Sequence, residues 1–212
     1  MAIDPMKIEA PAEPLGLVQL PDLPDTPDPI LTEWLPPNDE SARPLMTLAT
    51  LDVDGAPDAR SVLLTEFSPE GFWFHTDLDS RKTGQLAAHP VAALVLAWPE
   101  RRRQIVIRGS VEPADADESA RAYRARSPYL QQLAWQNTDE FALLPYAERA
   151  AAWAAFTAAH PDGFDEPPTW VGYLLRPRRI SFWTGSPEAP GRRAEYSRTA
   201  VEAPWTVSVH AG

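Results

Sequence analysis

The sequence predicts a mainly β fold with peripheral helices, in which one antiparallel barrel or sandwich forms the core. Short apolar or alternating runs recur between residues 45 and 112, with tight turns between them, as expected for antiparallel strands. The spacing then becomes helical between residues 115 and 159, and strand-like runs return from residue 171. A chain of 212 residues without an internal repeat suits one domain with an appendage.

Proline is concentrated in the N-terminal segment, residues 1–43, which holds nine of the 24 prolines. Because proline fixes φ and lacks an N–H donor, we expect this segment to be partly extended or disordered and to drape over the body. Within it, Ile30–Leu35 could form a short helix. Residues 1–5 are interpreted as a vector remnant before a native start at Met6. Residues 44–212 form the predicted barrel domain.

The first part of this domain is expected to hold three strands, Leu45–Leu51, Arg60–Phe67 and Phe72–Thr76. Turns rich in Asp, Pro and Gly at residues 52–55 and 68–71 connect them. Strand alternation in the third run places Phe72 and Phe74 on one face and Trp73 and His75 on the other.

A short helix is expected next at Ser80–His89, with polar capping residues at its start and a proline after its end. Val91–Trp98 is continuously apolar, as in a strand that is buried on both faces. Gln104–Glu112 alternates between apolar and polar residues and predicts the following strand.

The second part is expected to begin with two helices, Asp115–Ala125 and the alanine-rich Tyr146–Ala159, with mixed structure at residues 127–143 between them. Strands at Val171–Leu175, Arg179–Trp183 and Trp205–Val209 then complete the chain. The prediction is thus a β core with two inserted helices.

Composition excludes several classes of function. The net charge of −11 argues against general binding to nucleic acid or to an anionic membrane, because both need a basic surface. The chain has no cysteine, so it forms no disulfide and no thiolate zinc site, and a cytoplasmic location is expected. Apolar runs are too short for a membrane span. Its four histidines show no metal-ligand spacing, so no metal site is predicted.

Three cations form the first candidate site. Arg60 lies in a predicted strand, and Arg81 and Lys82 open a predicted helix about twenty residues later. A helix start already offers free N–H groups and the positive end of the dipole, so two added cations there indicate an anionic ligand. The alternative is a solvated Ser-Arg-Lys sequence at a helix start, and spacing alone slightly favours that alternative.

Two further residues are candidates for contact with a planar ligand. Gln104 begins an otherwise apolar strand, and its amide offers both a donor and an acceptor. Trp183 ends a strand and could flank a ring. Their ordinary alternatives are a strand-end glutamine in solvent and a core tryptophan.

Taken together, these segments resemble the pyridoxamine 5′-phosphate oxidase family of FMN-dependent split-barrel proteins. The resemblance covers about residues 40–210 and implies a split β-barrel with peripheral helices. Matching segments in the first half are PLMTLATLDVD (44–54), RSVLL (60–64), GFWFHT (71–76) and SRK (80–82). Matching segments in the second half are WPE (98–100), RQI (103–105), GY (172–173), RI (179–180) and FWTG (182–185).

The resemblance implies an FMN site whose residues are mostly retained. By similarity, Arg60, Arg81 and Lys82 hold the flavin phosphate, and the residues that follow Arg60 line the flavin. The implied cofactor contacts are Arg60, Ser61, Val62, Leu63, Leu64, Thr65, His75, Thr76, Arg81, Lys82, Gln104, Trp183 and Arg193. The family forms homodimers with each FMN between two subunits, so a homodimer with FMN at its interface is expected.

The residues that would bind a vitamin substrate depart from the family pattern. Thr65 stands where the family has a lysine. In the helical region, Ala122 and Leu130 stand where the family has tyrosine and serine, and only Arg126 matches, which makes it the single expected substrate contact. Residues 188–193 lack the first arginine and the histidine of the family's Arg-Leu-His-Asp-Arg run.

We therefore expect an FMN-dependent oxidase or oxidoreductase that acts on a small molecule other than pyridoxamine or pyridoxine 5′-phosphate. Two alternatives stay open, a flavin-binding protein without catalysis and a related split barrel that uses a deazaflavin. No nucleic-acid or membrane partner is expected.

Overall fold

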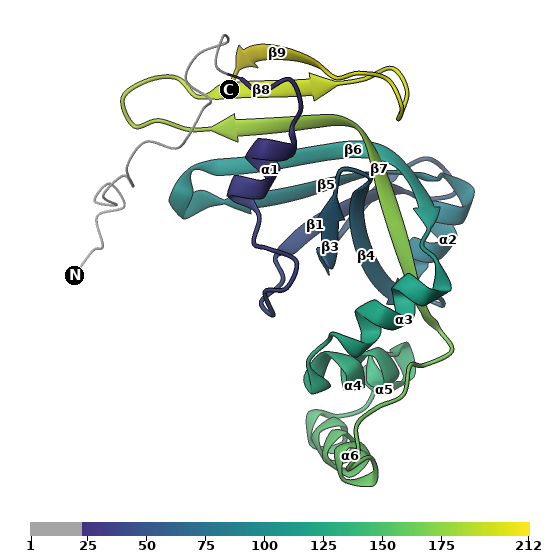
Figure 1. Cartoon of the computed structure of the whole chain (residues 1–212). Coiled ribbons are helices and arrows are strands. Elements are labelled where there is room, and N and C mark those ends of the chain that lie inside the picture. The colour runs from purple at the N-terminus through teal and green to yellow at the C-terminus, as the bar shows by residue number, and fades with distance from the viewer. Residues whose placement is uncertain (1–22) are drawn as a thin grey trace, which may run out of the picture.

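A nine-stranded antiparallel sheet forms the body of the molecule and curls into a half-open barrel (Figure 1). This computed structural model describes residues 23–212, so the predictions for residues 1–22, including the vector remnant, lie outside the described residues. In sheet order, the main path is β2 (Pro57–Leu63), β1 (Leu45–Leu51), β5 (Val91–Trp98), β6 (Arg103–Pro113), β7 (Trp170–Thr184), β4 (Gly71–Asp77) and β3 (Glu66–Ser68). β8 (Arg192–Ser197) pairs with β7, and β9 (Thr206–Ala211) pairs with β8. The predicted mainly β split barrel is confirmed.

The long strand β7 has different neighbours at its two ends. Its first residues pair with β4 and its last residues pair with β8, while β6 lies along both parts. The register between β6 and β7 shifts at Arg108/Gly109. A Cβ atom at Gly109 would lie 1.9 Å from the carbonyl oxygen of Arg176, so this close approach requires glycine. On either side of this point, β7 pairs with β4 and with β8, respectively.

Several strand predictions need correction. The expected strand Arg60–Phe67 breaks at residues 64–65, because Leu64 and Thr65 bond to Pro44 and Trp73 outside the β1 ladder. The two expected strands around Pro177 are one strand, β7, because the bulge accommodates the proline. β8 was not predicted, since its polar residues alternate with only two buried ones, Ala194 and Tyr196. Finally, Val91–Trp98 is buried on one face only.

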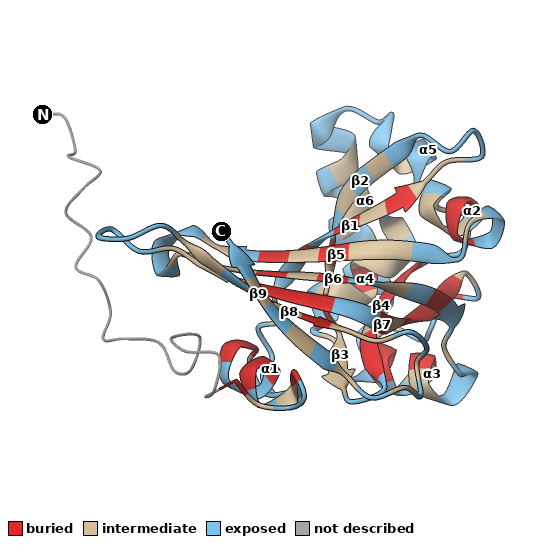
Figure 2. Cartoon of the chain, turned by 90° about the horizontal axis from the view of Figure 1, so that it is seen from above, coloured by how far each residue is buried: buried red, intermediate tan, exposed pale blue. Residues whose placement is uncertain are grey.

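The core lies inside the curl of the sheet. Buried residues concentrate on the strands and on the helix α1 (Asp28–Trp34), whereas α6 (Tyr146–Ala159) has none (Figure 2). In α1, Trp34 is 5% exposed and meets Phe182 edge-to-face at 5.4 Å. The segment after residue 22 therefore covers an apolar surface of the barrel, and the predicted short helix near residues 30–35 is present.

Of the remaining helices in the described part of the chain, two contact the sheet, and those between residues 128 and 159 project away from it (Figure 1). α2 (Arg81–Ala88) stands beside β1, and α3 (Ala116–Arg124) packs against β7 (Figure 1). The region expected to be mixed, residues 127–143, contains α4 (Pro128–Gln136) and α5 (Asp139–Ala142), because Ser127 and Thr138 cap two separate helix starts. Among residues 23–212, no helix is long and apolar enough to cross a membrane.

Candidate functional site

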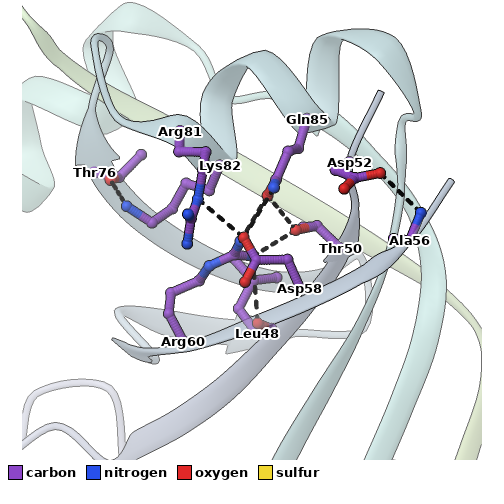
Figure 3. A network of polar contacts seen from close by, with 10 residues as sticks. All are labelled: Leu48, Thr50, Asp52, Ala56, Asp58, Arg60, Thr76, Arg81, Lys82 and Gln85. Atoms are coloured by element: carbon purple, nitrogen blue, oxygen red, sulfur yellow. Dashed lines mark hydrogen bonds and ion pairs between the residues drawn. The ribbon is translucent and has the colours of Figure 1, made fainter. Parts of the chain in front are cut away.

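Arg60 is fixed inside one end of the barrel by four acceptors. Its Nη1 atom donates to Thr50 Oγ1 at 2.5 Å and to the Leu48 carbonyl at 3.4 Å. Its Nη2 atom donates to Asp58 Oδ2 at 2.8 Å and to Gln85 Oε1 at 2.6 Å (Figure 3). The guanidinium therefore has one orientation, with 18% of the side chain exposed.

The helix α2 brings the other two predicted cations to the same place (Figure 3). Arg81 is 77% exposed, and its Nε atom lies 3.0 Å from Asp58 Oδ2. Lys82 donates to Thr76 Oγ1 at 2.9 Å, and no ion pair in the described chain involves Lys82. Burial lowers the pKa of Lys82, and the nearby Arg60 lowers it further, while Asp77 opposes the change. A half-buried ammonium beside two arginines is unfavourable unless an anion joins it.

The charges of this cluster match a phosphate monoester. Arg60, Arg81 and Lys82 carry +3, and Asp58, which is paired with both arginines, carries −1, which leaves +2; the charge of Asp77, which acts on Lys82, lowers this towards +1. A hydrogen bond from Gln85 lowers the pKa of Asp58, and the charges of Arg60 and Arg81 add to this, so Asp58 remains a carboxylate. A phosphate monoester carries about −1.5 to −2 at pH 7. The donor set therefore fits the phosphate of FMN, and the start of α2 adds its dipole.

A second group of predicted residues lies on the outer face of the sheet. Gln104, Trp183 and Arg193 form one row across β6, β7 and β8, because Gln104 pairs with Trp183 and Trp183 pairs with Arg193. They line an open cavity of about 450 Å³. Its remaining lining residues are Val106, Arg108, Ser181, Glu195 and Gly212.

One chain does not bring the two groups into a single site. Across the sheet, Arg60 of β2 lies opposite Leu48 of β1, Leu48 lies opposite Leu94 of β5, and Leu94 lies opposite Ile107 of β6. Ile107 is three residues beyond Gln104 on β6. At about 4.8 Å per strand and 3.3 Å per residue, Gln104 is roughly 17 Å from Arg60 along the sheet. The groups also face opposite sides, since Ile105 and Ile107 point into the core.

The strand after Arg60 divides its side chains between the two faces. Val62 and Leu64 are buried in the core, so only their backbone can reach a ligand. Ser61 and Leu63 alternate with them and face outward. Thr76 belongs to the cation cluster through Lys82.

The predicted contacts His75, Thr65 and Arg126 gather around a third place, the indole of Trp170. The His75 side chain is fully buried, stacks on Trp170 at 5.1 Å and bonds to Thr65 and Glu118. The Arg126 guanidinium lies 4.2 Å from the centre of the same indole. Burial lowers the pKa of Arg126 to about 10. No described carboxylate pairs with this cation.

Sequence reasoning missed the residues that organise the predicted ones. Asp58 stands two residues before Arg60, and that spacing on a strand puts both side chains on one face. Gln85 stands four residues after Arg81, one helical turn along α2. Glu118 carried no signal, and Trp170 was expected only as a core or interface residue, because α3 and β7 meet β4 only in the folded chain.

Comparisons with known proteins agree with this geometry. Residues 39–146 match the family profile described as pyridoxamine 5′-phosphate oxidase, and residues 170–210 match the pyridoxine 5′-phosphate oxidase C-terminal dimerisation region. A pyridoxine/pyridoxamine 5′-phosphate oxidase of Azorhizobium caulinodans is 40% identical over 87% of this chain and 89% of its own length. One of Thermosynechococcus vestitus is 42% identical over 72% of each chain.

Two solved structures are also similar. PhzG from Burkholderia lata 383, in complex with tetrahydrophenazine-1-carboxylic acid, has a TM-score of 0.76 and 26% identity, over 91% of this chain and 95% of PhzG. A pyridoxamine 5′-phosphate oxidase-related, FMN-binding protein of Nostoc punctiforme has a TM-score of 0.60 and 20% identity, over 79% and 86% of the two chains. The second likeness concerns the fold alone.

Proposed function

We propose, since this chain belongs to the pyridoxamine 5′-phosphate oxidase family, that it is an FMN-dependent oxidoreductase whose substrate is not pyridoxamine or pyridoxine 5′-phosphate. The observation that carries the proposal is the net +2 cluster of Arg60, Arg81, Lys82 and Asp58 at the start of α2. When bound, FMN would supply a ring that accepts a hydride and passes the electrons to an acceptor such as O₂.

Each part of the chain has a distinct role in this proposal. In the cation cluster, Arg81 and Lys82 donate to the phosphate, while Arg60, whose four Nη hydrogens already have acceptors, contributes its charge and its Nε–H and loses little side-chain freedom when the ligand binds. Gln104 and Trp183 line a surface on which a flat ring can rest. Because this surface lies far from the cluster in one chain, the proposed complete site combines the cluster of one protomer with this surface of its partner.

The exposed outer face of the sheet supports a homodimer. Leu45 and Val91 lie at opposite ends of this face with 64% and 47% exposure, and the apolar side chains of Ala93 and Val95 between them are only half-buried. Apolar side chains exposed together on a sheet indicate a contact surface. The match of residues 170–210 to a dimerisation region includes β7 and β8, which border this face.

The proposed substrate differs because few residues remain to bind a vitamin phosphate. Arg126 is present, but Thr65, Ala122 and Leu130 replace a lysine, a tyrosine and a serine of the family pattern. Each lost charge-assisted bond removes about 1.5–3 kcal/mol of binding. The remaining guanidinium, over the face of Trp170, suits one anionic group on a flat molecule, such as the ring carboxylate of the ligand in the PhzG complex.

The test is the identity and reactivity of the bound cofactor. The purified protein is denatured, and mass spectrometry of the released chromophore is expected to give FMN; a deazaflavin or no chromophore would overturn the proposal. Peroxide release is then measured with pyridoxamine 5′-phosphate and with reduced phenazine carboxylates. Turnover of the first at the rate of an authentic oxidase would refute the substrate assignment. Bound FMN that no substrate reduces would favour the flavin-binding protein without catalysis.

A further inference from the structure

Three polar side chains form a hydrogen-bonded row between the end of β2, the strand β4 and the helix α3. The Nδ1 atom of His75 lies 2.9 Å from Thr65 Oγ1, and its Nε2 atom lies 3.1 Å from Glu118 Oε2. His75 is fully buried, Glu118 is 14% exposed and Thr65 is half-buried. Thr65 is therefore the member of the row that a ligand can reach.

The donors and acceptors in this row have one consistent arrangement. A carboxylate only accepts hydrogen bonds, so the Nε2 atom of His75 must carry a hydrogen. In a neutral imidazole the other nitrogen is then an acceptor, and the Thr65 hydroxyl donates to Nδ1. The order hydroxyl, imidazole, carboxylate is the arrangement that activates a hydroxyl for proton transfer.

Packing holds the imidazole in this position. Its ring lies parallel to the indole of Trp170, with an angle of 5° between the planes. On β7, Gly172 stands opposite His75, and a Cβ atom there would lie 2.7 Å from His75 Nε2. The Oε1 atom of Glu118 is buried without a hydrogen bond, and the nearest cation is Arg121 at 3.9 Å. The carboxylate is thus held against the imidazole at a fixed position.

We infer that Thr65, His75 and Glu118 form a proton relay that takes up the proton which the substrate loses on oxidation. This inference rests on the proposed function. Oxidation of a CH–NH or CH–OH group breaks the C–H bond as a hydride, which carries both electrons to the flavin oxidant, and releases one proton from nitrogen or oxygen. That proton bonds to Thr65 Oγ1 while the hydroxyl proton of Thr65 moves to His75 Nδ1, and the resulting imidazolium faces Glu118.

The three residues have different roles in this relay. Thr65 is the catalytic residue, because it meets the substrate. His75 and Glu118 are positioning residues that act through Thr65. The same indole that stacks on His75 carries Arg126, so a substrate anion held at Arg126 would lie on the side of the barrel where the relay ends.

The first experiment needs no substrate. Nitrogen NMR of protein labelled with ¹⁵N-histidine is expected to show His75 as the neutral Nε2–H tautomer, with its signal assigned by its loss in His75→Gln. In Thr65→Val the Nδ1 resonance should shift, because its donor is gone, whereas in Thr65→Ser it should stay close to that of the wild type. A resting Nδ1–H tautomer or a doubly protonated ring would overturn the inference, since neither can accept the Thr65 proton.

The second experiment compares two reductants of the holoprotein without oxygen. The amine probe is tetrahydrophenazine-1-carboxylic acid, which must lose a proton from nitrogen as a C–H bond gives up its hydride, whereas a synthetic dihydronicotinamide gives up a hydride alone. Thr65→Val and His75→Gln are expected to slow flavin reduction by the amine by about 10²–10⁴-fold and to leave reduction by the dihydronicotinamide unchanged. Thr65→Ser should recover the rate lost in Thr65→Val, and His160→Gln, on the exposed end of α6, is the control.

The outcomes separate this inference from the proposed function. Equal slowing with both reductants would mean that the row is structural and would overturn the relay. A wild-type protein without FMN would instead refute the proposed function. If the amine is not oxidised at all, the tautomer of His75 still decides whether the relay has the required acceptor.

Discussion

Replacing Lys82 by glutamine tests whether the cation cluster is a phosphate site. The substitution removes one positive charge but keeps a long polar side chain that can still bond to Thr76. A charge-assisted hydrogen bond contributes about 1.5–3 kcal/mol, so the dissociation constant for FMN is expected to rise. At about 1.4 kcal/mol per factor of ten, the rise is roughly 10- to 150-fold.

The structure also predicts what this substitution does to the protein without ligand. Burial and the charge of Arg60 lower the pKa of Lys82, which means that the folded state disfavours the charged form. Glutamine should therefore leave the free energy of unfolding unchanged or raise it. Loss of ligand binding without loss of stability is the signature of a binding residue.

The assay is the titration of apoprotein with FMN and with riboflavin, followed by flavin fluorescence. Riboflavin lacks the phosphate, so Lys82→Gln should leave its affinity unchanged. Arg101→Gln, in the exposed turn before β6, serves as the control. An unchanged affinity for FMN, an equal loss for both flavins, or a fall in stability of more than about 1 kcal/mol would refute the reasoning.

Two further predictions concern stability. Gly172→Ala should lower the free energy of unfolding by about 1–3 kcal/mol, because its Cβ would press on His75. The control Gly84→Ala, in open space on α2, should leave the free energy of unfolding unchanged or raise it. Urea denaturation measures both variants, and equal effects would contradict the close packing at Gly172. Burial raises the pKa of Tyr196 to about 12. The protonated phenol therefore contributes its full stabilisation of the folded state below about pH 10, and this contribution is lost as the pH rises towards 12. Tyr196→Phe should remove this part of the alkaline loss, along with the hydrogen bond to Pro24, and identical alkaline unfolding curves for both proteins would contradict it.

Local patterns predicted the strands well where burial alternates or a turn residue is required. The run before residue 55 and the pair Phe72/Phe74 needed only strand period and turn chemistry. The continuous apolar run of β5 misled, because sequence shows hydrophobicity but not whether a protomer or its partner covers a face. β8 was missed because a strand with two buried residues has almost no apolar signal.

The sequence predicted the cations of the candidate site but not the residues that hold them in place. Arg60, Arg81 and Lys82 were found as cations near a helix start, and the folded chain brings them around Asp58. The sequence gives no sign that the carboxylate of Asp58 belongs to this cluster, because its negative charge opposes an anionic ligand. The flavin contact of His75 stays a prediction. Its ring is held between Thr65, ten residues away, and Glu118, 43 residues away, and the sequence gives no signal for the second of these contacts.

The bulge between β6 and β7 separates the sheet into two independent registers. Trp170 and Trp183 stand at opposite ends of β7, on either side of Pro177. A one-residue insertion on one side of the bulge would move every side chain from there to the end of the strand to the opposite face of the sheet. The bulge would prevent this change of register from reaching the other side. A change of register near Trp170 would therefore leave Trp183 aligned with its neighbours on β6 and β8.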